Sequence, residues 1–197
     1  MKICIFQGTF NPIHNVHLKM AEFVLKNYGF EKIIFIPAAV PPHKKYEQKN
    51  AIHRLNMVRL ATSYNPRFEV SDIEFQLNNI SYSYLTALEL YKKYDIDNKI
   101  NFIIGSDAFE KIESWYKSDE FKKLVDFIVF VREKDFTPKR FAYLKNKGCN
   151  FQFASFPFED ISSTNIREKI AAGSFTGNLI PQKVEEYIRN NELYKKQ

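Results

Sequence analysis

Two histidines, His14 and His17, lie three residues apart at the start of a segment with the apolar spacing of a helix. Residues at i and i+3 share one face of a helix, so both imidazoles would point the same way. The segment follows an apolar run that ends at Gly8 and a turn that contains Asn11 and Pro12. This order of strand, tight turn and helix N-terminus favours an anion such as phosphate, because the first N–H groups of a helix lack partners within the helix.

Three roles fit the histidine pair: metal ligation, a structural role in the core, and donation to a phosphate. Zinc needs four ligands, and the other histidines, His43 and His53, and the two cysteines show no ligand spacing. The pattern therefore disfavours zinc. The residues alone leave the structural role and the phosphate contact open.

Other groups that could contact a nucleotide follow expected strands or lie in expected loops. His43 and Lys44 belong to the stretch 38–50, AAVPPHKKYEQKN, whose composition describes an exposed loop. Asp107 follows an expected strand that ends near Gly105. A carboxylate there could accept hydrogen bonds from ribose hydroxyls or cap the next helix.

Aromatic and hydroxyl side chains offer further candidates. Trp115 is the only tryptophan and is either a core aromatic or a stacking platform. The segment 162–167, SSTNIR, opens an expected helix. Its hydroxyls could be ordinary caps, with Asn165 and Glu168 at capping-box spacing, or could cradle phosphate together with Arg167. Arg54, near the start of another helix, could form a surface ion pair.

Strand-like runs alternate with segments of helical period, which predicts an α/β fold with a parallel sheet and right-handed crossovers. Gly29 is expected to end the first helix and Pro181 to begin the last. The expected strands are 2–7, 32–37, 67–75 (with a break near Ser71), 100–104, 126–131 and 150–156. The expected helices are 15–28, 51–63, 81–94, 117–124, 137–147, 163–172 and 181–190.

The chain length and composition indicate one domain over residues 1–197, with a helical C-terminal part. No apolar run is long enough to span a membrane or to form a signal-peptide core, so a cytoplasmic protein is expected. The net charge of +6 could favour binding to a nucleic acid, but the sequence contains no basic block and no RNA-binding signature. Most of the lysines are therefore expected on a solvated surface. The fingerprint GxGxxG and the P-loop are both absent.

The segment QGTFNPIHNVHL resembles the GTFDPxHxGH signature of the nucleotidyltransferase superfamily. Three later stretches narrow the resemblance: PPHK at 41–44, GSD at 105–107 with Trp115 downstream, and ISSTNIR at 161–167. Together they are similar to the bacterial nicotinate-nucleotide adenylyltransferase family. The match runs in order over nearly the whole chain. It implies a Rossmann-like, doubly wound parallel sheet of the HxGH type.

The resemblance also implies roles. His14, His17, Lys44 and Arg167 would stabilise charge during transfer. ATP would contact Gly8, Thr9, Phe10, His17, Ser163, Thr164 and Arg167. The mononucleotide would contact Asn11, His43, Lys44, Ser83, Tyr84, Gly105, Asp107, Trp115 and Tyr116, with the Trp115–Tyr116 pair facing its pyridine ring.

Three residues depart from the family pattern. Gln7 stands where the family has glycine, Asn11 where it has aspartate, and Val16 where it has the glycine before the second histidine. Asn11 keeps a side-chain carbonyl but loses the charge. Val16 is bulkier and could crowd a nucleotide.

The implied activity is transfer of AMP from ATP to nicotinate mononucleotide, which gives the nicotinate dinucleotide and pyrophosphate. Mg²⁺ would accompany ATP, with most of its ligands from substrate phosphates and none from a dedicated protein site. The expected partners are these small molecules, with no nucleic acid and no membrane, and a homo-oligomer is left open. Alternatives are an enzyme for nicotinamide mononucleotide or phosphopantetheine, or a non-catalytic nucleotide-binding protein.

Overall fold

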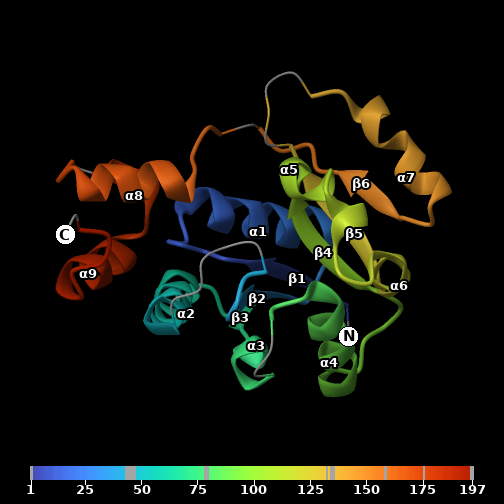
Figure 1. The fold of residues 1–197 in the computed structure, drawn as a ribbon, viewed down its shortest axis with the longest axis horizontal. Coiled ribbons are helices and arrows are strands. Elements are labelled where there is room, and N and C mark those ends of the chain that lie inside the picture. The colour runs from blue at the N-terminus through green and yellow to red at the C-terminus, as the bar shows by residue number, and fades with distance from the viewer. Residues whose placement is uncertain are drawn as a thin grey trace.

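A six-stranded parallel sheet forms the centre of the molecule (Figure 1). The computed structural model describes residues 2–42, 48–77, 80–131, 133, 136–157, 159–174 and 176–195. The strands are β1 (Ile3–Gly8), β2 (Lys32–Pro37), β3 (Phe68–Val70), β4 (Ile100–Gly105), β5 (Val125–Phe130) and β6 (Phe151–Phe153).

Helices connect and cover the strands. The α-helices are α1 (Asn15–Tyr28), α2 (Gln48–Thr62), α3 (Ile73–Gln76), α4 (Ser83–Lys93), α5 (Ser106–Phe109), α6 (Ser118–Leu124), α7 (Ala142–Asn146), α8 (Ser163–Ala171) and α9 (Gln182–Asn190). Single 3₁₀ turns are η1 (Ile112–Ser114), η2 (Pro138–Phe141) and η3 (Gly177–Leu179). In Figure 1, α8 and α9 lie together on the side of the molecule opposite α7.

The strand order is β3-β2-β1-β4-β5-β6, so the chain reverses its direction of travel across the sheet between β1 and β4. These two strands pair at Cys4–Asn101 and Ile5–Phe102. Ligands of open α/β sheets bind outside the carboxyl ends of strands at such a switch point. The order therefore confirms the predicted doubly wound fold and places the candidate site beyond β1 and β4.

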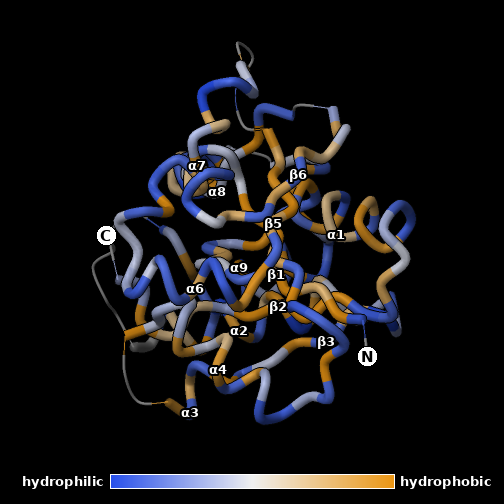
Figure 2. The backbone as a smooth tube through the Cα atoms, turned by 90° about the vertical axis from the view of Figure 1, so that its right-hand side faces the viewer, coloured by the Kyte–Doolittle hydropathy of each residue, from blue (hydrophilic) through white to orange (hydrophobic). Residues whose placement is uncertain are grey.

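Each face of the sheet has its own hydrophobic core. Cys4 and Phe6 of β1 point to the face covered by α1, α2, α8 and α9, whereas Ile3 and Ile5 point to the face covered by α3 to α7. Hydrophobic segments accordingly concentrate around the central strands in Figure 2, and hydrophilic ones predominate on the outer turns. Burial of both faces explains why the strands lack strict polar alternation.

Most expected elements are confirmed to within a few residues, and Gly29 ends α1 in the left-handed conformation as expected. The strand predicted over 67–75 is wrong in its second half. It ends at Val70, and α3 follows because the buried Glu74 carboxylate finds hydrogen-bond donors there rather than a place in a strand.

Three further expectations need correction. The helix expected over 137–147 instead consists of the 3₁₀ turn η2, which begins at Pro138, followed directly by the short α7. The cap of α8 is Ser162, whose hydroxyl accepts from the Asn165 N–H at 3.2 Å, and not an Asn165–Glu168 box. The 38–50 loop is shorter than expected, since α2 begins at Gln48.

Both cysteines are buried free thiols. Within the described ranges, no helix has the length and apolar character that crossing a bilayer requires.

Candidate functional site

The segment after β1, residues 8–14, is called the nucleotide loop below. Phe10 has a φ of 47° and a ring that is 3% exposed, packed against Phe6 and Phe35. A Cβ atom on Gly8 would meet the Phe10 ring at 3.2 Å. Gly8 is thus needed because an aromatic ring lies directly against it. Because the Phe10 ring is buried, only the backbone of Phe10 can face a ligand.

The histidine pair opens α1 beside the loop. His14 is the N-cap residue and is 1% exposed, while His17 is half-buried. Their rings stack with centroids 3.6 Å apart. The His14 backbone N–H donates to His17 Nδ1 at 3.2 Å. Because Nδ1 accepts, the proton of a neutral His17 ring belongs on Nε2, which makes that nitrogen a donor.

The start of α8 docks on the nucleotide loop from more than 150 residues away in the chain. Ser163 Oγ donates to the Pro12 carbonyl at 2.9 Å, and Arg167 Nη1 donates to the Asn11 carbonyl at 2.8 Å. Arg167 Nη2 also lies 3.4 Å from Thr164 Oγ1, and the Thr164 side chain is exposed. The N-termini of α1 and α8, a guanidinium and a histidine therefore meet at one loop. Helix N-termini and an arginine together favour a phosphate.

The C-terminal segment after α9 holds the same loop from another side. The Tyr194 hydroxyl donates to Asn11 Oδ1 at 2.5 Å. Burial raises the pKa of this phenol, although the nearby Arg167 and Arg54 charges act in the opposite direction. The side-chain oxygen that Asn11 shares with aspartate is thus directed toward Tyr194.

Arg54 is buried, with 3% of its surface exposed, so it does not form the surface ion pair that its position left possible. Its guanidinium donates to the Thr9 carbonyl at 2.9 Å and to the Ala38 and Ala39 carbonyls at 2.5 and 3.3 Å. Ala38 N–H also donates to the Gly8 carbonyl at 2.9 Å. Arg54 therefore joins the nucleotide loop to the start of the 38–50 stretch.

Glu74 also connects the end of β1 to the start of the 38–50 stretch. This carboxylate is 2% exposed and accepts from the Ala39 N–H at 3.2 Å, from Thr86 Oγ1 at 2.7 Å, and from Gln7 Nε2. Burial raises its pKa, and the hydrogen bonds from neighbouring donors only partly offset that effect. Gln7, which replaces the family glycine, thus contributes a contact to this buried cluster.

A group of tyrosines lies where the start of α4 meets the segment before α6. Tyr82 and Tyr116 stack with ring centroids 4.5 Å apart, and Tyr84 meets Tyr116 edge to face at 6.3 Å. We call Tyr82, Tyr84 and Tyr116 the aromatic cluster. Ser83 and Tyr84 open α4, and the Ser81 N–H donates to the Val40 carbonyl at 2.9 Å. This hydrogen bond joins the cluster to the start of the 38–50 stretch.

Trp115 is directed differently from Tyr116. Its indole packs against Phe102 and Phe121, with centroids 6.2 and 6.0 Å away, and is half-buried, whereas Tyr116 is 43% exposed. Gly105 is the N-cap residue of α5 and Asp107 lies exposed in its first turn, so Asp107 is not the cap.

The structure thus brings Gly8, Thr9, Phe10, Asn11, His14, His17, Ser163, Thr164 and Arg167 together around the nucleotide loop. Ser83, Tyr84 and Tyr116 gather in a second group, and Gly105 and Asp107 lie at the end of β4. His43 and Lys44 lie outside the described residues.

Sequence reasoning missed the buried contacts of Glu74 and Tyr194. A carboxylate between apolar residues, as in Ile73–Glu74–Phe75, was a usable signal for Glu74. No local pattern marks Tyr194, whose partner lies 183 residues away.

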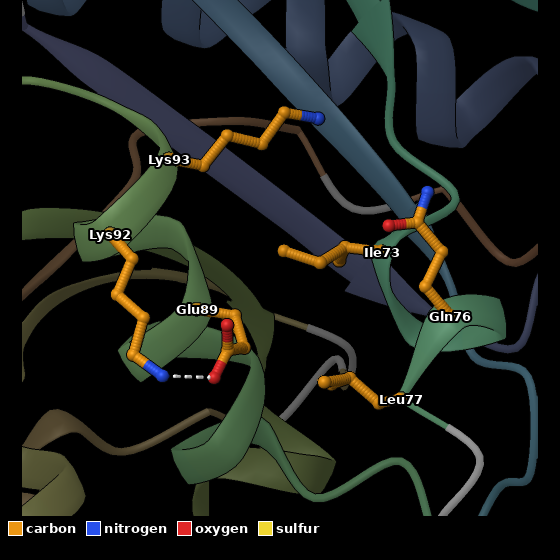
Figure 3. Close-up of a pocket in the computed structure, with 6 residues that line it drawn as sticks. All are labelled: Ile73, Gln76, Leu77, Glu89, Lys92 and Lys93. Atoms are coloured by element: carbon orange, nitrogen blue, oxygen red, sulfur yellow. Dashed lines mark hydrogen bonds and ion pairs between the residues drawn. The ribbon is translucent and has the colours of Figure 1, made fainter.

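A cavity of about 280 Å³ lies elsewhere, between α3 and α4 (Figure 3). It is lined by Ile73, Gln76, Leu77, Glu89, Lys92 and Lys93. Lys92 Nζ pairs with Glu89 across 2.6 Å, as the dashed line shows. The α4 residues that line it, Glu89, Lys92 and Lys93, belong to the second half of that helix, away from the Ser83 end that carries the aromatic cluster.

Within the described part of the chain, no group of three or more His, Cys, Asp or Glu side chains could hold a metal ion. The donors gathered at the nucleotide loop are N–H groups, hydroxyls and a guanidinium, which suit an anion rather than a bare cation.

Comparison with known proteins agrees with this geometry. The cytidylyltransferase-like family matches residues 5–169. A Bacillus subtilis protein named nicotinate-nucleotide adenylyltransferase is 39% identical over 194 residues, which cover 98% of each chain. The fold is similar to that of Plasmodium falciparum nicotinic acid mononucleotide adenylyltransferase complexed with NaAD, with a TM-score of 0.80 and 19% identity over 98% of this chain and 96% of that one.

The order of the motifs and the similarity over the full length agree with each other. The chain belongs to the cytidylyltransferase-like family, and its relatives include proteins named nicotinate-nucleotide adenylyltransferase.

Proposed function

We propose that the protein transfers AMP from ATP to the 5′-phosphate of nicotinate mononucleotide and releases pyrophosphate. One observation carries the proposal: α8, with Ser163 and Arg167, is docked on the nucleotide loop beside His17 at the switch point of the sheet. Two helix N-termini and a guanidinium face one place, as a triphosphate requires.

In the proposed reaction, a phosphate oxygen of the mononucleotide attacks the α-phosphorus of ATP. One P–O bond forms as the bond to the pyrophosphate oxygen breaks. The attacking phosphate is already an anion at neutral pH, so no side chain has to remove a proton. Such transfers depend mainly on positioning and on stabilising charge.

The residues divide these tasks. The His17 Nε2–H would donate to the α-phosphate as its charge develops, and the backbone of Gly8, Thr9 and Phe10 would lie against ATP. Arg167, with Ser163 and Thr164, would hold the β- and γ-phosphates, and His14 would support His17 through the stacked ring and the hydrogen bond to Nδ1.

The acceptor would lie between the aromatic cluster and the end of β4. Its pyridine ring would rest on Tyr116 and Tyr84 and on the exposed edge of Trp115, near the N-terminus of α4 at Ser83. Asp107 would accept from ribose hydroxyls beside Gly105. Asn11, His43 and Lys44 would face the acceptor phosphate, with Lys44 neutralising charge where the two anions meet.

Mg²⁺ would arrive with ATP and keep phosphate and water oxygens as its ligands, because Mg²⁺ dehydrates reluctantly and binds through substrate phosphates in such sites. When bound, it neutralises part of the triphosphate charge. The cytoplasm, where ATP and the mononucleotide are both present, is the proposed location.

A pyrophosphate-release assay tests the proposal, with ATP and each of three acceptors: nicotinate mononucleotide, nicotinamide mononucleotide and phosphopantetheine. Release should be fastest with the nicotinate acceptor. Release only with phosphopantetheine would move the protein to a sister activity. No release with any acceptor, together with retained ATP binding, would support the non-catalytic alternative.

A further inference from the structure

The ammonium group of Lys117 lies over the aromatic cluster. Its Nζ atom is 5.2 Å from the centroid of the Tyr84 ring and 5.9 Å from that of Tyr116. Both distances are within the range of cation–π attraction. Lys117 follows Tyr116 directly and is the N-cap residue of α6, with φ 49° and ψ 46°. A cation therefore sits beside the surface on which the acceptor ring is proposed to rest.

The charge of Lys117 is not neutralised by a neighbouring carboxylate. Among the described residues, none of the ion pairs within 4.0 Å includes Lys117. The nearest acid along α6, Asp119, instead pairs with Lys122 at 2.8 Å. A ligand on the aromatic cluster would thus experience the Lys117 charge.

The two candidate acceptors differ by one unit of charge on the ring. The ring of each mononucleotide is a pyridinium, with a positive charge at its nitrogen. The nicotinate carboxylate cancels that charge, whereas the carboxamide of the nicotinamide form leaves it in place. A cation beside the ring therefore repels the amide form more than the acid form.

The tyrosine faces alone would act in the opposite direction. Aromatic faces attract cations, so a cluster of three tyrosines without Lys117 would favour the ring that keeps its positive charge. Preference for the acid form needs a group that reverses this tendency. A repulsive element against the wrong ligand is a common source of specificity.

We propose that Lys117 is a specificity-determining residue, which selects nicotinate over nicotinamide mononucleotide by placing a cation over the aromatic cluster. This inference rests on the proposed function. One unit of charge at ~6 Å in a partly solvated site changes affinity by roughly 3- to 10-fold. Salt should reduce the effect, because Lys117 is exposed and exposed charges are screened.

The test compares kcat/KM for the two mononucleotides in the unsubstituted protein and in Lys117→Met, which keeps the length and apolar stem of the side chain. We expect kcat/KM to rise for the amide form, whose ring keeps its charge, and to change little for the acid form, whose ring charge is cancelled, so that the acid-to-amide ratio falls ~3- to 10-fold. A gain for the amide form alone distinguishes this role from a structural one, which would lower both values together.

Lys123→Met is the matched control, since it removes the same charge from the other end of α6. Its ratio should match that of the unsubstituted protein. Lys117→Glu should shift the ratio further than Lys117→Met, in the same direction.

An unchanged ratio in Lys117→Met, or equal losses for both acceptors, would overturn the inference and leave the proposed function standing. Calorimetric titration of the unsubstituted and Lys117→Met proteins with each mononucleotide gives a second readout that needs no turnover. Absence of pyrophosphate release by the unsubstituted protein would overturn the proposed function. The ratio of the two dissociation constants would still decide whether Lys117 discriminates between the rings.

Discussion

On the side proposed to bind ATP, called the ATP side below, three separate parts of the chain hold the nucleotide loop: Ser163 and Arg167 of α8 bond its carbonyls, Arg54 of α2 bonds Thr9, and Tyr194 bonds Asn11. On the side proposed to bind the mononucleotide, called the mononucleotide side below, Tyr116 is 43% exposed, the rings of the aromatic cluster contact one another, and a lysine lies over them. The first region is held by partly buried hydrogen bonds, and the second presents exposed aromatic surface with a cation over it.

This difference suggests a division of labour. Charge stabilisation in transfer depends on donors that are positioned before the reaction, which the ATP side provides. Choice between two similar rings needs only a modest difference in energy, which an exposed charge and aromatic faces can supply. Substitutions on the ATP side should therefore alter turnover, and substitutions in the aromatic cluster should alter preference.

His17→Ala should have the largest effect. Loss of one donor to the developing charge is expected to lower kcat by ~10²–10³-fold. Pyrophosphate release with both substrates at saturation measures this. The acid-to-amide ratio should stay constant, since the donor acts on ATP.

His53→Ala is the matched histidine control. His53 Nδ1 lies 2.9 Å from the Tyr187 hydroxyl and links α2 to α9, so this variant should lose stability and keep its kcat. A fall of less than about tenfold in His17→Ala would show that the ring does not stabilise the transferring phosphate.

Arg167→Met should have the next largest effect. A hydrogen bond to a charged group contributes about 1.5–3 kcal/mol, so kcat/KM for ATP should fall by ~10- to 100-fold. The binding constant for the mononucleotide, measured without ATP, should change little. Arg189→Met, on the exposed end of α9, is the control for loss of charge. Equal losses for ATP and mononucleotide binding would break the proposed separation of the two sides.

Glu74→Gln should change how stability depends on pH. Burial raises the Glu74 pKa above its ordinary value of 4.5, so the folded protein holds this proton more tightly than the unfolded chain. The stabilising effect of protonation is complete below the ordinary pKa and is lost as pH rises through the folded pKa. Glutamine cannot titrate, so urea unfolding from pH 4 to 8 should show a smaller loss of stability with rising pH in the variant.

This variant also tests the connection between the two sides. Glu74 contacts Gln7 before the nucleotide loop, Ala39 at the start of the 38–50 stretch, and Thr86 of α4. We expect the KM values for both substrates to rise by a few-fold, with little change in kcat. An identical pH profile of stability in both proteins would show that Glu74 does not titrate in this range.

The structure gathers the residues expected on the ATP side more completely than those expected on the mononucleotide side, for a physical reason. Gly8, His17 and Ser163 lie at strand ends and helix starts, where local patterns of glycine, turn residues and caps are informative. The contacts of Arg54 and Glu74 were not predicted, because their partners belong to distant segments of the chain. The residues carry no mark of such partners, and Glu74 instead looked like part of a strand.

Trp115 and Lys117 show the same limit on the other side. A lone tryptophan is a conspicuous signal, but its indole is half-buried against Phe102 and Phe121. The more exposed ring belongs to Tyr116, and the cation above it comes from a residue that composition describes only as a surface lysine. Which of two adjacent aromatics faces solvent depends on the turn between η1 and α6, and no local pattern specified that turn.

Tyr194→Phe should have the smallest effect, and it tests whether the ATP side acts independently of the mononucleotide side. It removes one hydroxyl and leaves Asn11 Oδ1 without the hydrogen bond of 2.5 Å that it now accepts. A hydrogen bond of this kind contributes about 1 kcal/mol, so the free energy of unfolding should fall by ~1 kcal/mol and KM for ATP should rise a few-fold at most.

The acid-to-amide ratio of Tyr194→Phe should not move, because Tyr194 contacts the nucleotide loop and no member of the aromatic cluster. Tyr64→Phe is the control: its hydroxyl donates to Glu22 at 2.5 Å on the exposed surface, so its loss should leave KM for ATP unchanged. A changed ratio in Tyr194→Phe would show that the C-terminal segment acts on both sides, and that the ATP side is less independent of the acceptor than its hydrogen bonds indicate.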